Sequence, residues 1–94
     1  MRTSAPVSHI QFRPASDVDL SSGLLGWVTF TFRGLQIDGS YVRRTRAGRV
    51  VLFWANHESG SGRRHVIVQP VDQELRVALE QYVLGELRRR GLLR

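Results

Sequence analysis

Residues 24–54 read LLGWVTFTFRGLQIDGSYVRRTRAGRVVLFW, and this stretch decides the fold. The run 27–32 alternates with period two and is rich in β-branched and aromatic residues, with Val28 and both phenylalanines on one side. That pattern predicts a half-buried β-strand. The dipeptide 33–34 turns the chain, and a second strand is predicted over residues 35–42. Because the link is short, the two strands are expected to pair antiparallel.

Glycines and apolar runs place the remaining strands. Asp38-Gly39 predicts a bulge or tight bend within the second strand, and Gly48 predicts a left-handed residue in a hairpin turn at 46–49. The run 50–54, VVLFW, is apolar throughout. Such a run is typical of a strand that is covered on both faces or lies in a partner interface. Two further strands and two loops complete this region: strands at 7–13 and 64–68, the latter with Val66 and Val68 inward, and loops at 15–23 and 56–62.

The pattern changes to helical spacing after Pro70. Asp72 is the expected N-cap and Gly91 the expected stop, with arginines in the last turn, where cations suit the helix dipole. One apolar stripe is predicted to face the sheet, formed by Leu75, Leu79, Tyr82 and Val83. Val77 and Leu84 lie roughly opposite that stripe. Together with Trp54 they are the expected contacts of a dimer.

These elements predict an α+β fold, an antiparallel β-meander of about five strands with one C-terminal helix packed on it. Residues 7–91 are expected to form a single domain, and residues 1–6 a disordered lead-in. The chain has 94 residues, near the lower end of comfortable independent folding. Burial of further surface in a homodimer would therefore add stability.

Composition excludes several classes of function. Cysteine is absent, so there is no disulfide framework, thiol nucleophile or cysteine metal site. The longest apolar run, 50–55, is far too short to span a membrane, and the first residues lack a signal-peptide core. A cytoplasmic protein without membrane contact is expected. The formal net charge is +6, and all 14 basic residues are arginine, the better planar and bidentate ligand for phosphate.

The arginines are concentrated where the strands are predicted. Between residues 43 and 64 the chain has six arginines and one acid, Glu58. If the hairpin ends that carry them are adjacent, they form one basic surface that would bind nucleic-acid phosphates. The expected phosphate ligands are Arg43, Arg44, Arg46, Arg49, Arg63 and Arg64. Two alternatives stay open, a solvated face that serves solubility and a protein–protein interaction module whose arginines meet acids of a partner.

Four aromatic residues are candidates for stacking on bases, namely Trp27, Tyr41, Phe53 and Trp54. Such residues more often belong to a core or an interface, and Tyr41 is the strongest candidate because it adjoins two arginines. The histidines lack metal-ligand spacing, and the glycine-rich segment 59–63 lacks the ending of a P-loop. No catalytic carboxylate pair or activated serine is evident. We therefore expect no enzyme, metal or cofactor.

The order and spacing of several segments resemble the SpoVG family of stage V sporulation and septation-regulator proteins. The resemblance spans residues 7–87 and rests on VSHIQFRP at 7–14, the segment 35–39, VVLFW at 50–54, a polar loop, Gln69-Pro70 and the closing helix. It implies a small α+β dimer that binds DNA or RNA and regulates gene expression in bacteria. A Lys-Arg pair tied to binding in the family falls at His57 and Glu58 here, so part of that role would pass to Arg63 and Arg64.

Overall fold

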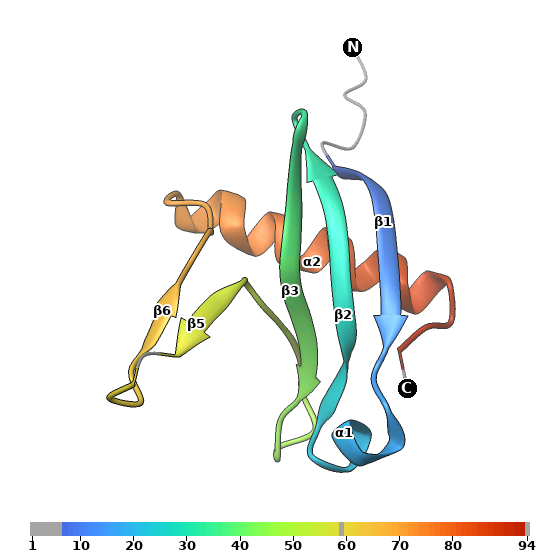
Figure 1. Ribbon diagram of the computed structural model, residues 1–94. Coiled ribbons are helices and arrows are strands. Elements are labelled where there is room, and N and C mark those ends of the chain that lie inside the picture. The colour runs from blue at the N-terminus through green and yellow to red at the C-terminus, as the bar shows by residue number, and fades with distance from the viewer. Residues whose placement is uncertain (1–6, 59, 94) are drawn as a thin grey trace.

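The computed structural model describes residues 7–58 and 60–93; the lead-in expected at residues 1–6 lies outside them. In chain order the elements are β1 (Val7–Pro14), α1 (Asp17–Ser21), β2 (Leu24–Phe32), β3 (Leu35–Arg44), β4 (Val50–Phe53), β5 (Asn56–Glu58), β6 (Arg64–Val66) and α2 (Gln73–Arg89). Strands β1 to β4 form an antiparallel sheet in sequence order, and β5 and β6 form a separate two-stranded hairpin. Helix α2 crosses one face of the larger sheet (Figure 1). The predicted α+β meander with a C-terminal helix is confirmed.

Turn and bulge residues set the register of the sheet. The β2–β3 turn is Arg33-Gly34, with φ of 51° and 82°, as a two-residue turn of type I′ requires. Farther along, the pairing shifts between Phe30↔Ile37 and Val28↔Ser40, so that the predicted bulge at Asp38-Gly39 is confirmed. Gly39 has φ of 88° there, a conformation that glycine adopts without steric cost.

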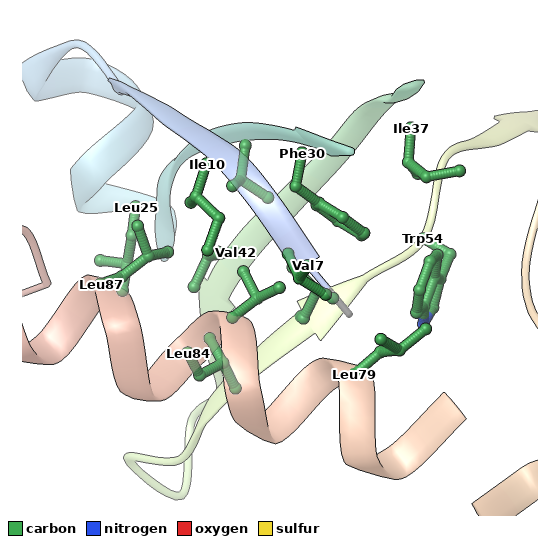
Figure 2. Packing of buried hydrophobic residues seen from close by; sticks show 13 residues of the cluster. Val7, Ile10, Leu25, Phe30, Ile37, Val42, Trp54, Leu79, Leu84 and Leu87 are labelled. Atoms are coloured by element: carbon green, nitrogen blue, oxygen red, sulfur yellow. The ribbon is translucent and has the colours of Figure 1, made fainter. Parts of the chain in front are cut away.

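The core lies between the larger sheet and α2, as Figure 2 shows. Phe30 is fully buried, and Leu79, Val83 and Leu87 of α2 are buried against the sheet. Alternation along β2 therefore produces the buried face that the sequence predicted. Burying Leu, Val and Phe side chains supplies about 1.5–3 kcal/mol each, the main stabilisation of so small a fold.

Two of the expected dimer contacts are instead part of this core. Trp54 is only 6% exposed; its ring meets Phe30 edge-on at 5.8 Å, and its Nε1 donates to Glu80 Oε2 at 2.6 Å. Leu84 is 8% exposed and packs with the stripe of α2 rather than opposite it (Figure 2). The expectation that Leu84 would face away from the sheet was wrong, because α2 buries a stripe wide enough to include it. Tyr82, the fourth residue of the predicted stripe, is exposed instead of facing the sheet.

Helix α2 begins and ends where the sequence indicates. The Asp72 carboxylate caps it by accepting from the backbone N–H of Glu74 at 2.9 Å and of Leu75 at 3.4 Å. At the other end Gly91 has φ of 73°, and the N–H of Leu92 donates to the carbonyl of Leu87 at 3.0 Å. This is a Schellman closure, which satisfies carbonyl groups left open by the last turn.

Four local expectations are corrected. The 50–54 run is not covered on both faces: Leu52 is buried, but Val51 and Phe53 are half-buried because β4 is an edge strand with one open face. Residues 15–23 contain the short helix α1, capped by the Ser16 hydroxyl, rather than only a loop. Residues 56–62 contribute β5, which pairs with β6 and not with the larger sheet. Val66 and Val68 are consequently exposed rather than inward.

Candidate functional site

The face of the larger sheet opposite α2, called the open face below, carries a row of four paired residues. Within the described part of the chain no helix covers it, and it is turned toward the viewer in Figure 1. The register places Arg13 beside Trp27, Trp27 beside Tyr41, and Tyr41 beside Phe53. Since paired residues of neighbouring strands point to the same side, the row crosses all four strands.

The three aromatic residues of this row, called the aromatic row below, are Trp27, Tyr41 and Phe53. The guanidinium of Arg13 lies 4.6 Å from the Trp27 ring centroid, a cation–π distance. The Tyr41 and Phe53 rings are parallel within 2°, with centroids 5.2 Å apart. All three are half-buried, so each keeps part of its ring surface in contact with water. An aromatic surface of this kind can stack on the bases of a single strand.

Hydrogen bonds fasten the β5–β6 hairpin to this row. Arg64 Nη1 donates to the Tyr41 hydroxyl at 2.9 Å and to Asn56 Oδ1 at 3.3 Å. Asn56 Nδ2 donates to the same hydroxyl at 2.9 Å and to the Trp54 carbonyl at 2.8 Å. The Tyr41 oxygen therefore accepts twice. This arrangement brings a guanidinium from a distant segment of the chain to the edge of the aromatic row.

The other arginines that the sequence singled out are divided between two places. Arg43 lies two residues beyond Tyr41 on the open face, and its Nη2 donates to the Ser22 carbonyl at 2.8 Å. Arg44 follows on the other side of β3, while Arg46 and Arg49 are exposed at the β3–β4 turn beside α1 (Figure 1). Arg63, also exposed, precedes β6 on the hairpin that projects to the left in Figure 1. The two turns do not form one compact end.

Among the carboxylates whose side chains the structure describes, a set that leaves out Glu58, none forms an ion pair with these six arginines. The ion pairs join Arg76 to Glu80 at 3.4 Å, and Glu86 to Arg89 at 2.7 Å and to Arg90 at 3.5 Å. The hydrogen bond from Arg89 holds the pKa of Glu86 below its ordinary value, and the pKa of Arg89 is raised in return. The ion pairs of the described side chains therefore all involve arginines of α2 or of its C-terminal end. Unpaired guanidinium groups are available to an anionic ligand.

One member of the row, Arg13, was not among the residues predicted to bind, whereas the three residues of the aromatic row were candidates for stacking. Arg13 lies 14 positions before Trp27 in the sequence, so only the β1–β2 register shows that they are neighbours. One signal was present: Trp27 occupies the side of its strand that otherwise carries Thr29 and Thr31. A single exposed aromatic residue is ordinary, and only the register, which gathers several rings on one face, turns them into a patch that indicates binding.

Other functional classes find little support in the geometry. In residues 7–58 and 60–93, no three His, Asp or Glu side chains lie close enough together to hold a metal ion. The helices of the described chain are too short or too polar for any of them to cross a membrane. Compared with family models, with curated proteins and with solved structures, the chain matches none.

Proposed function

We propose that this protein binds single-stranded nucleic acid on its open face and acts as a regulator of the kind that the SpoVG resemblance implies. One observation carries the proposal. The aromatic row crosses a sheet face that no described helix covers, with Arg13 over the ring of Trp27 at one end and Arg64 bonded to the hydroxyl of Tyr41 in the middle. Stacking platforms lined by cationic side chains are the usual means of binding single strands.

The chemistry divides into two parts. The rings of the aromatic row would stack on bases, each stack contributing about 1–3 kcal/mol with little regard to sequence. The guanidinium groups would bind phosphates and release counterions, a contribution that falls as salt rises. A single strand is favoured over a duplex because the rings lie on a sheet surface, and bases in a duplex are stacked on one another and not free to reach them.

Binding titrations at several salt concentrations test this proposal. The probes are a single-stranded DNA, a single-stranded RNA of the same sequence and the corresponding duplex, all labelled at one end. The expected result is tighter binding of a single strand than of the duplex, with affinity falling as salt rises. Absence of binding to all three at low salt would refute the proposal, and preference for the duplex would refute the stacking mode.

We further propose that two copies associate through the exposed apolar segment 66–71. Ile67 is 68% exposed, and Val66 and Val71 are exposed as well. The segment joins β6 to α2, the helix that packs on the core. A two-stranded hairpin such as β5–β6 is marginally stable alone, so that pairing with a second copy would support it. Sedimentation at tens of micromolar protein should give a dimer, and Ile67→Asp should give a monomer. A monomeric wild-type protein would refute this and favour a different protein partner for the segment.

A further inference from the structure

An open hollow of about 390 Å³ adjoins the aromatic row on the open face. Its walls include Gln11, Arg13, Trp27, Thr29 and Asp38, from three neighbouring strands. The volume lies within the range of sites that hold small organic ligands. The hollow combines an aromatic ring, a guanidinium, an amide and a carboxylate. Stacking on a base needs only the aromatic ring, so the three polar groups beside it could distinguish one base from another.

The carboxylate of Asp38 is held in a fixed orientation. Its Oδ1 accepts from the Thr29 hydroxyl at 2.9 Å and from the Gly39 N–H at 2.8 Å. The β-bulge described above places both donors, and a Cβ at Gly39 would lie 3.1 Å from the Cβ of Ala55. Within the described residues no donor is bonded to Oδ2. One carboxylate oxygen is thus fixed by the fold, and the other remains free to accept.

A carboxylate on a surface that binds phosphates works against the attraction of the backbone, since like charges repel. It becomes favourable only if the ligand presents N–H donors to it at that position. Nucleobases differ in this respect. Guanine presents two adjacent donors, the N1–H and the N2 amino group, beside the acceptor O6. Adenine and cytosine place a single amino group next to a ring nitrogen acceptor, and uracil and thymine place one N–H between two carbonyl groups.

We propose that this hollow is a guanine pocket, with the base stacked on Trp27 and its N1–H and N2 amino group directed to Asp38. The Arg13 guanidinium, which lies over the Trp27 ring in this structure, would give up that position to the base, and O6 would then accept from Arg13 or from Gln11 in the same hollow. This inference rests on the proposed function, because the pocket would take one base of a bound strand. It assigns a base preference to a surface whose other contacts are independent of sequence.

The test uses the full chain and five oligothymidine 9-mers that differ only at the central residue. That residue is dG, dA, dC, dT or deoxyinosine, and a single guanine prevents four-stranded assembly. The dG strand is expected to bind about tenfold more tightly than the dA, dC and dT strands, the discrimination of one good bidentate contact. Deoxyinosine keeps N1–H but lacks the amino group, so its affinity should be intermediate.

The variant Asp38→Asn sharpens the test. The amide oxygen can still accept from Thr29 and from the Gly39 N–H, while an amino group replaces the free oxygen and meets the donors of guanine. The preference for dG should disappear, and affinity for the other strands should stay equal or rise because a negative charge is removed. Asp17→Asn makes the same charge change on exposed α1, outside the hollow, and should keep the preference.

The outcomes separate this inference from the function beneath it. If all five strands bind the wild-type protein equally, or if Asp38→Asn keeps the dG preference, the guanine pocket is refuted while single-strand binding stands. If none of the strands binds at low salt, both are refuted. Loss of the preference in the Asp17→Asn control as well would also overturn the pocket, because the effect would then follow from charge alone.

Discussion

Removing the two arginines at the β3–β4 turn is expected to reduce the salt dependence of binding without affecting the fold. Arg46 and Arg49 are exposed, and within the described residues their side chains form no hydrogen bond or ion pair. The turn itself is closed by backbone bonds, from the Thr45 N–H to the Arg49 carbonyl at 2.7 Å and from the Gly48 N–H to the Thr45 carbonyl at 2.9 Å. Alanine preserves these bonds. The double variant Arg46→Ala/Arg49→Ala should therefore unfold within about 0.5 kcal/mol of the wild type.

The size of the binding effect follows from the number of phosphate contacts. If all six arginines of the candidate set contact a single strand, the slope of log affinity against log salt is about −4. Affinity would then fall about 300-fold between about 50 and 200 mM salt. The double variant keeps four contacts, so its slope should be about −3 and its affinity should fall about 50-fold over the same range. Fluorescence anisotropy of a labelled 9-mer at five salt concentrations measures both slopes.

The matched control is Arg88→Ala/Arg89→Ala, which removes the same charge from the last turn of α2. Arg89 pairs with Glu86 there, and the placement of both residues is explained by the helix dipole. The control should keep the wild-type slope. If both double variants flatten the slope equally, binding responds to net charge and not to the turn. If the turn variant keeps the wild-type slope, these two arginines do not contact phosphate.

Three further outcomes are expected. Trp27→Ala should weaken binding about 5- to 150-fold, the loss of one stack, with an unchanged salt slope, and a flattened slope in the same titrations would contradict stacking. Leu79→Ala should cost about 2–4 kcal/mol in urea unfolding because this side chain is 2% exposed, whereas Val77→Ala at the helix surface should cost less than about 1 kcal/mol. Glu86→Gln should destabilise the fold at neutral pH but not in acid. Because the pKa of Glu86 is lowered in the folded protein, its carboxylate stabilises the fold at pH values above the pKa of the unfolded chain, and that stabilisation is lost as pH falls through the pKa of the folded state. A wild-type–variant difference in urea unfolding that persists in acid would contradict that reasoning.

Local signals were sufficient for much of the fold. The alternation of β2, the glycine of the bulge and the capping residues of α2 each act through neighbours in sequence, and each prediction made from them is confirmed. The pairing of the strands within residues 56–68 could not be predicted in this way. The same short, β-rich segment can extend the larger sheet or form its own hairpin, and the choice depends on contacts such as Arg64 with Tyr41 that join distant parts of the chain.

The candidate site was predictable only in part for the same reason. Charge density along the chain indicated the arginines, but not which of them approach an aromatic surface. The row depends on register across strands, and a shift of one residue would move Trp27 to the opposite face. Leu84 illustrates the converse error. Because Leu84 lies seven residues from Val77, both were expected on the outward face of α2. The buried stripe of α2 is wide enough to include Leu84, whereas Val77 is exposed.

The aromatic row is the feature that the stability of the fold does not explain. A chain of 94 residues has few large apolar side chains to bury, and burial of each would contribute to a marginal free energy of folding. Trp54 is used in that way, in the core against Phe30. Trp27, Tyr41 and Phe53 remain half-exposed on the uncovered face, where threonine serves at the neighbouring positions of β2. Three rings kept from the core, beside guanidinium groups that form no ion pair with any carboxylate whose side chain the structure describes, are the arrangement expected of a surface that binds a flat and anionic ligand.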